Sequence, residues 1–359
     1  MRAKRGFQPA AQGRAVQSRH DDLGTVLHRR DDLVEIGAAR RLAELAPGDL
    51  RISFWCNSGT EAIEGAIKLA RAATGRTTIV STIDAFHGKT MGALSVSGRE
   101  TFQTPFKPLL EGFAHVPYGD ASMLDEALAD AAAFVVEPVQ GEGGVNVPPE
   151  GYLRAVREAC DRTGALFIAD EVQTGLGRCG YVFASNRDDV VPDVMTLAKG
   201  LSGGVMPVGA FVARPGCWNR AFGKAPLLHT STFGGNELAC VAALTAMDVL
   251  VEEQLVDNAR ERGRQLLAGA QAIAAEFPEV VREARGLGLL VGVELTSEGY
   301  GGWIIPEMLK AGVTAAWTLN LQRVIRLEPP LIVTAAEVEK ALAALRAGVQ
   351  TAQDKLGKL

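Results

Sequence analysis

Short apolar segments alternate with helical segments along most of this chain, and this alternation limits its fold more than any other feature. Residues 77–82, 132–139 and 165–172 predict strands, and residues 150–164 predict a helix between the last two. Residues 193–214 predict two further strands. Apolar strands separated by helices are typical of a mostly parallel central sheet with helices on both faces, so the predicted fold class is α/β.

The character of the sequence changes twice, which predicts the domain organisation. Residues 1–37 are polar and lack a clear period, so we expect a flexible N-terminal segment there. Residues 38–255 carry the alternating pattern and form the predicted large domain. A long helical stretch runs from about residue 236 to 277, and mixed strand and helix patterns follow it. Residues 256–359 are therefore expected to form a connecting helix and a smaller C-terminal α+β domain.

Composition narrows the possible functions. The 359 residues are 47% hydrophobic, which is enough for a large core. The net charge of −5 and the lack of a Lys/Arg stripe argue against nucleic-acid binding. No apolar run reaches the roughly 18 residues of a membrane span, and no secretory signal is recognisable. Five cysteines without CxxC spacing favour reduced thiols in a cytoplasmic protein, and the scattered histidines do not indicate a metal centre.

One candidate site lies where a predicted strand at residues 52–56 runs into a predicted helix at 61–75. Ser58, Gly59 and Thr60 occupy the junction. Free N–H groups and the positive end of the helix dipole suit a phosphate there, and Gly59 lets the backbone approach it closely. The same residues could equally form an ordinary helix cap.

Two further candidates follow predicted strands. Asp170 ends the apolar run 165–169, and a carboxylate at the C-terminal end of a parallel strand lies at the edge where such sheets bind ligands. Lys199 ends another strand beside glycines, where a lysine can react with a carbonyl as a neutral amine. Taken singly, each could be a surface residue. Together with the phosphate site, they supply a lysine for the aldehyde of pyridoxal phosphate and an acid for its ring nitrogen.

A glycine-rich stretch, Gly175 to Gly180, matches the G-x-G-x-x-G pattern of dinucleotide-binding sites. Such a site would need these glycines to open an amphipathic helix directly after the strand. A short apolar segment and the polar residues 186–189 follow instead. We therefore interpret the glycines as a loop.

Several motifs together resemble those of class III aminotransferases, which are enzymes of fold type I that depend on pyridoxal phosphate. The motifs are CNSGTEA, AFHGKTMGALS, VVEPVQGEGGV, FIADEVQTGLGR, LAKGLSGGVMPVGA, HTSTFGGN and IRLEPPL, within about residues 38–359. They are most similar to putrescine aminotransferases and to the acetylornithine and ornithine enzymes. The resemblance implies the central sheet and the smaller domain described above.

The resemblance also implies a set of cofactor-binding residues: Ser58, Gly59, Thr60, Phe86, His87, Asp170, Val172, Gln173, Lys199 and Thr232. The first three would hold the phosphate. Phe86, with His87 beside it, would stack on one face of the pyridine ring, and Val172 would cover the other.

Asp170 and Lys199 would be the catalytic residues. Asp170 would pair with the protonated ring nitrogen, and Lys199 would bind the cofactor aldehyde as a Schiff base. Gln173 would hydrogen-bond near the ring hydroxyl. Thr232 would reach the phosphate in a neighbouring subunit's site, so the resemblance implies a homodimer or a dimer of dimers.

The resemblance assigns three residues to the substrates. Arg326 would bind a substrate carboxylate, because a planar guanidinium fits a carboxylate bidentately, although a structural ion pair is the alternative. Glu142 would pair with Arg326 while an amine donor occupies the site. Lys89 stands where acetylornithine and ornithine enzymes more often have arginine, which favours a diamine. The expected partners are a putrescine-like amine and a keto acid, 2-oxoglutarate, which react in turn.

Three alternatives stay open. The donor could be N-acetylornithine, ornithine or 4-aminobutyrate. The same scaffold also supports aminomutases and amino-acid epimerases, which differ in needing no keto-acid cosubstrate. Finally, residues 1–37 do not resemble the N-terminal segment that builds one wall of the substrate pocket in this family, so a cofactor-binding protein without activity is also possible.

Overall fold

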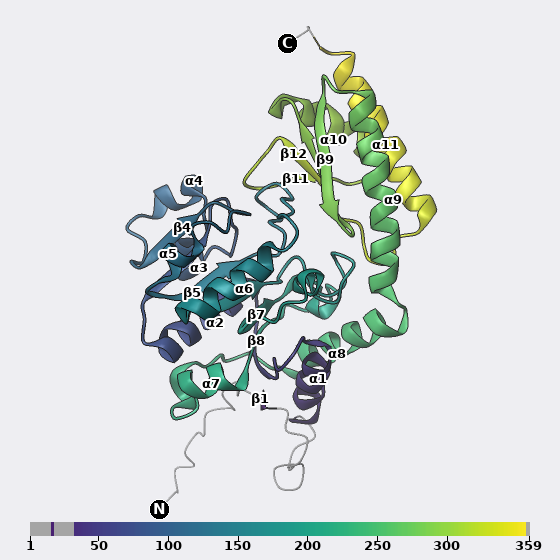
Figure 1. Cartoon of the computed structure of the whole chain (residues 1–359). Helices are drawn as coiled ribbons and strands as arrows, with labels where there is room; N and C mark the ends of the chain where they lie inside the picture. The colour runs from purple at the N-terminus through teal and green to yellow at the C-terminus, as the bar shows by residue number, and fades with distance from the viewer. Residues whose placement is uncertain (1–15, 18–31, 357–359) are drawn as a thin grey trace, which may run out of the picture.

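The computed structural model describes residues 16–17 and 32–356 of the chain (Figure 1). These residues form two sheets, each covered by helices. Residues 1–15 and 18–31 make up most of the segment that we expected to be flexible, and they lie outside the described residues. That expectation stays a prediction for them.

The larger sheet carries the parallel strands. Its strands are β1 (Val16–Gln17), β2 (Ile52–Cys56), β3 (Thr78–Thr82), β4 (Phe113–Val116), β5 (Ala131–Val136), β6 (Leu166–Asp170), β7 (Val194–Leu197) and β8 (Gly209–Ala213). They lie in the order β1-β2-β8-β7-β6-β5-β3-β4. Strands β4, β3, β5, β6 and β7 are parallel neighbours, whereas β8 is antiparallel to β7 and β2. The predicted mostly parallel sheet is confirmed.

Helices bury both faces of this sheet, which explains its almost continuous apolar strands. The helices around it are α1 (Asp32–Leu45), α2 (Gly59–Thr74), α3 (Met91–Val96), α4 (Glu100–Gln103), α5 (Leu124–Leu128), α6 (Tyr152–Thr163), α7 (Pro215–Ala221) and α8 (Glu237–Glu252). Successive strand residues point to opposite faces. Val135 and Ile168 therefore join the cluster under α2 and α7, and Phe134 and Phe167 join the one under α5 and α6.

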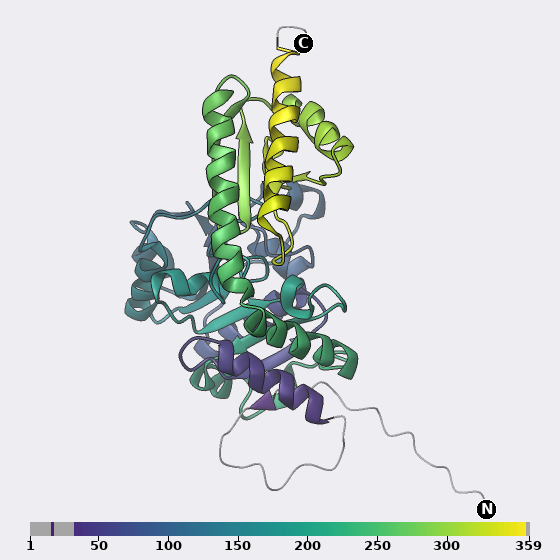
Figure 2. The same cartoon turned by 90° about the vertical axis from the view of Figure 1, so that its right-hand side faces the viewer.

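The second sheet lies beside the first and is antiparallel. Its strands are β9 (Val281–Leu287), β10 (Leu290–Leu295), β11 (Ala316–Trp317) and β12 (Val324–Leu327), in the order β11-β12-β10-β9. The helices α9 (Leu255–Glu276), α10 (Gly301–Lys310) and α11 (Ala335–Gln353) pack against it around one apolar cluster. Figure 2 shows α9 and α11 side by side along β9. No helix in residues 32–356 is long and apolar enough to cross a membrane.

Several sequence predictions need correction. The long helical stretch predicted for residues 236–277 consists of two helices, α8 and α9. Gln254 lies between them with a φ of 53°, and a right-handed helix cannot continue through a residue with a positive φ. Helix α1 begins at Asp32, so residues 32–37 are helical and do not belong to the flexible segment predicted for residues 1–37. The strands β4 and β9 were missed because both are edge strands whose exposed or charged residues weaken the apolar pattern.

Candidate active site

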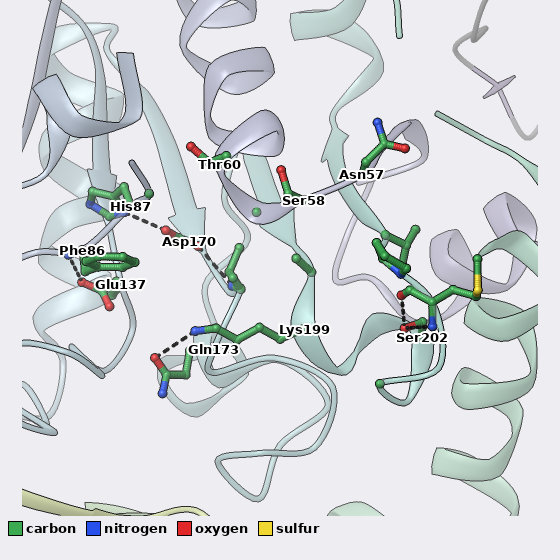
Figure 3. Close-up of a pocket in the computed structure, with 18 of the residues that line it drawn as sticks. Asn57, Ser58, Thr60, Phe86, His87, Glu137, Asp170, Gln173, Lys199 and Ser202 are labelled. Atoms are coloured by element: carbon green, nitrogen blue, oxygen red, sulfur yellow. Dashed lines mark hydrogen bonds and ion pairs between the residues drawn. The ribbon is translucent and has the colours of Figure 1, made fainter. Parts of the chain in front are cut away.

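A cavity of about 480 Å³ opens at the carboxyl ends of β6 and β7, beside the start of α2. Side chains from distant parts of the sequence meet there (Figure 3). Every residue that the sequence places around a cofactor lines this cavity except Thr232; they are Ser58, Gly59, Thr60, Phe86, His87, Asp170, Val172, Gln173 and Lys199.

The first turn of α2 forms one wall of the cavity. Ser58 is the N-cap of this helix, because the backbone N–H of Glu61 donates to its hydroxyl (3.3 Å). Gly59 and Thr60 begin the helix, where backbone N–H groups have no intrahelical partner. A side chain at Gly59 would collide with Val172, since a Cβ would lie 2.9 Å from Cγ1. The cap does not exclude an anion site, because the Ser58 hydroxyl and the helix terminus line the same cavity.

Lys199 brings a primary amine to the cavity. It begins the 3-10 helix η3 (Lys199–Ser202), directly after β7 and Ala198. Its φ of 44° is left-handed, a conformation that costs energy for a lysine and is concentrated at functional sites. Its Nζ donates a hydrogen bond to Gln173 Oε1 at 3.1 Å (Figure 3). The backbone and Gln173 together determine where this amine lies.

Asp170 is the buried last residue of β6. Its Oδ1 accepts hydrogen bonds from the backbone N–H of Val172 (3.1 Å) and from the Thr196 hydroxyl (3.0 Å), and its Oδ2 lies 2.6 Å from His87 Nδ1. Burial lowers the pKa of His87, but the hydrogen bond and the charge of Asp170 outweigh burial and raise it above its ordinary value. Asp170 therefore stabilises the protonated form of His87, and His87 in turn holds one oxygen of the Asp170 carboxyl group in place at the cavity wall.

Glu137 is a cavity residue that the sequence analysis missed. It follows the carboxyl end of β5 as Asp170 ends β6, and this position is the signal that could have identified it. Its carboxylate accepts hydrogen bonds from the backbone N–H groups of Phe86 (3.1 Å) and Gly141 (3.2 Å). Burial raises the pKa of Glu137 to about 7, while the charge of His87 lowers it. A third titratable group therefore lies beside the His87–Asp170 pair.

These residues fit pyridoxal phosphate. The cradle at the start of α2 is shaped for an anion, and glycine is required beside it: Gly88 has a φ of 128°, and a Cβ there would lie 2.4 Å from Thr60 Oγ1. The cavity also combines an amine for the aldehyde, a carboxylate for the ring nitrogen, and the ring of Phe86. In the cofactor, a phosphate, an aldehyde and a basic pyridine ring are joined, so each group finds a matching residue.

The proposed carboxylate-binding residues lie outside this cavity, on the second sheet and a neighbouring loop. Arg326 belongs to β12, and its Nη1 donates to Glu142 Oε1 at 2.6 Å. Glu142 is buried, and its other oxygen accepts from the backbone N–H of Leu319 (2.8 Å). Arg326 Nε also lies 3.2 Å from the carboxylate of Glu328, which the sequence analysis did not single out.

A second cavity of about 480 Å³ adjoins the first. Both are lined by Val172, Gln173 and Lys199, and the second also contains Glu328 and Arg178. Arg178 lies in the glycine-rich stretch, which forms turns and no helix, as predicted. Lys199 thus lies where the two cavities meet.

The two remaining predicted residues are exposed. Lys89 Nζ lies 3.2 Å above the ring of Phe102 and 5.3 Å from that of Phe86, outside both cavities. Burial lowers its pKa. Thr232 lies in the exposed loop between η4 (Pro226–Leu228) and α8, away from the cavity of its own chain.

The fold and this cavity define a pyridoxal phosphate-dependent enzyme of fold type I, and comparisons with known proteins identify the family. The family model for aminotransferase class-III matches residues 14–349. The chain belongs to the class-III aminotransferases, which depend on pyridoxal phosphate. The family match begins earlier than residue 38, where the motifs alone placed the start of the resemblance.

Solved structures agree with this assignment. The chain is 33% identical to the ornithine aminotransferase from Toxoplasma gondii ME49, with a TM-score of 0.84 over 96% of this chain and 80% of the other. It is 30% identical to a transaminase from the marine bacterium Virgibacillus (TM-score 0.85, covering 94% and 82%). It is also 30% identical to an amine transaminase from an uncultivated Pseudomonas species in its PLP-bound form (TM-score 0.82, covering 94% and 83%).

Proposed function

We propose that this aminotransferase transfers an amino group from an ω-amine, a diamine such as putrescine, to 2-oxoglutarate. The observation that carries the proposal is the ion pair between Glu142 and Arg326 (2.6 Å). In this pair Glu142 neutralises the Arg326 guanidinium, which suits a donor that has no carboxylate. A keto acid would take the place of Glu142 and bind the guanidinium bidentately.

The residues of the main cavity have separable roles. Bound pyridoxal phosphate supplies an electron-accepting ring and an aldehyde that can be exchanged for an amine. Lys199 Nζ holds the proton that leaves the donor carbon, and Gln173 Oε1 orients that amine. Asp170 stabilises positive charge at the ring nitrogen, and His87 orients Asp170 through the 2.6 Å contact. Ser58 and the start of α2 hold the phosphate.

One alternative donor has specific support, and a different reaction on the same scaffold stays open. One structural relative is an ornithine aminotransferase, and ornithine carries a carboxylate that Arg326 could bind. Lys89 favours a diamine, because the acetylornithine and ornithine enzymes more often have arginine there. An aminomutase or an epimerase on the same scaffold would work without a keto acid.

A donor screen tests the proposal. Putrescine, ornithine, N-acetylornithine and 4-aminobutyrate would each be supplied with and without 2-oxoglutarate, and glutamate formation measured. We expect the highest kcat/KM with putrescine and no product without the keto acid. A strong preference for N-acetylornithine would refute the proposed donor, and turnover without 2-oxoglutarate would refute transamination as the main reaction.

We also propose that the protein is a cytoplasmic homodimer or dimer of dimers. The 3-10 helix η4, the loop that carries Thr232 and the start of α8 expose apolar side chains: Leu227, Leu228, Phe233 and Leu238 are each at least 67% exposed. An apolar surface of this kind favours burial against a second copy. All five cysteines are free and buried, in keeping with a reducing compartment. A fully active monomer in light scattering would contradict the assembly.

A further inference from the structure

The Glu328 carboxylate lies among three nitrogen donors at the border between the two sheets. Arg326 Nε lies 3.2 Å from Oε2, Arg178 Nε lies 3.5 Å from Oε1, and Gln173 Nε2 donates to Oε2 at 3.1 Å. Glu328 directly follows β12, and its side chain is 24% exposed. The three partners therefore fix the position of the carboxylate, but solvent or a ligand can still reach it.

Gln173 joins Glu328 to the reactive amine. Its Oε1 accepts from Lys199 Nζ, and its Nε2 donates to Glu328, so one carboxamide separates the two charged groups. The carboxamide lies against Gly141, where a Cβ would come within 2.3 Å of Oε1. The distance between Lys199 and Glu328 is thus set by a side chain that is packed in place.

Arg326 has two carboxylate partners on different nitrogens. Glu142 contacts Nη1 and Glu328 contacts Nε. Arg178 contacts Glu328 through Nε, while its Nη1 donates to the backbone carbonyls of residues 289 and 329. If Glu142 moves away, Arg326 keeps the Glu328 contact and presents only part of its charge to an incoming acid. Glu328 therefore weakens the attraction of the site for dicarboxylates.

In the second cavity, Glu328 is placed to bind a cationic ligand. Among the described residues that line it, Glu328 is the only acidic one, and much of the remaining lining is aliphatic: Leu176, Met247, Leu250, Leu255, Leu331 and Ile332. Lys199 lines the same cavity. An aliphatic chain with an amine at each end matches this lining, because one amine can react beside Lys199 while the methylene groups pack and the other ammonium approaches the carboxylate.

We propose that Glu328 is a specificity-determining residue that binds the distal ammonium of a diamine donor in the second cavity and lowers the affinity of Arg326 for dicarboxylates. This inference rests on the proposed function for the identity of the donor. If Glu328 had only a structural role, linking Arg178 to Arg326, replacing it would change the activity with all substrates to the same extent.

The test compares the wild-type holoenzyme with Glu328→Gln, and with Glu339→Gln as a control that removes one exposed carboxylate from α11. The amine half-reaction is followed by cofactor absorbance with putrescine and with 1-aminobutane, which lacks the distal ammonium. We expect the putrescine-to-aminobutane ratio of kcat/KM to fall about tenfold in Glu328→Gln, the typical effect of one charge-assisted hydrogen bond, and to stay constant in Glu339→Gln. An unchanged ratio overturns the proposal.

A second measurement separates this inference from the proposed function. Glutarate is a dicarboxylate without a reactive carbonyl, and its dissociation constant can be measured from the cofactor spectrum of each variant. We expect Glu328→Gln to bind glutarate about fivefold more tightly, because a like charge beside Arg326 is gone. If the wild-type protein does not use putrescine, the proposed donor is wrong, and the glutarate dissociation constants then test the role of Glu328 on their own. Unchanged glutarate affinity in Glu328→Gln then overturns the inference.

Discussion

Replacing Glu137 with glutamine should change how the stability of this protein depends on pH. The carboxyl group of Glu137 is buried beside Asp170 and His87, and burial raises its pKa from 4.5 to about 7. Between those values the folded protein binds a proton at Glu137 that the unfolded chain has released. The free energy of unfolding therefore falls as pH rises through this window.

The pKa shift determines the magnitude. One pKa unit corresponds to 1.36 kcal/mol, so the shift amounts to on the order of 3 kcal/mol, complete below pH 4.5 and lost above about pH 7. The raised pKa of His87 acts in the same direction, because its contribution is also lost as pH rises through the folded-state value. Glu137→Gln removes the first contribution and part of the second, because the charge of Glu137 is one cause of the raised pKa of His87. It also leaves Phe86 or Gly141 without its acceptor, at a cost of roughly 1–3 kcal/mol that does not depend on pH.

Urea unfolding of the cofactor-free protein at pH 5 and pH 8 measures the effect, at one protein concentration because the protein is expected to dimerise. We expect the stability of wild type relative to Glu137→Gln to fall by about 2–3 kcal/mol between the two pH values. Glu339→Gln, which changes an exposed carboxylate, should follow wild type. Parallel pH profiles for wild type and Glu137→Gln would refute the raised pKa of Glu137.

Three further predictions concern the reaction itself. Borohydride treatment of the holoenzyme should attach the cofactor to the peptide that contains Lys199, and label on another lysine would disprove that assignment. Asp170→Ala should keep cofactor bound through Lys199 but slow both half-reactions on the order of 100-fold, as loss of a preorganised charge typically does; near-wild-type rates would exclude its role. Glu142→Gln should slow the amine half-reaction about tenfold more than the keto-acid half-reaction, and Arg326→Ala should do the reverse, because the first removes the counter-charge and the second the acid's partner. Equal losses in both half-reactions for both variants would rule out the exchange of Glu142 for the keto acid at Arg326.

The sequence by itself was sufficient for those site residues that belong to a local pattern. Asp170 and Lys199 each end an apolar run, and the C-terminal end of a strand has a known place in a parallel sheet. Ser58 and Gly59 lie at a strand-to-helix junction, which is also a local signal. Such positions can be predicted because the end of an apolar segment in the sequence marks the residues that lie at the edge of the sheet.

Only the tertiary structure revealed the residues that act through distant neighbours. The position of Glu137 after an apolar strand was visible in the sequence, but its burial beside His87 and Asp170, which raises its pKa, was not. Glu328 contacts Arg178, Gln173 and Arg326, which come from two different sheets or their loops. Their pairing depends on how the second sheet docks against the first. Sequence periodicity describes each element alone, whereas the charge environment of a side chain depends on which elements surround it.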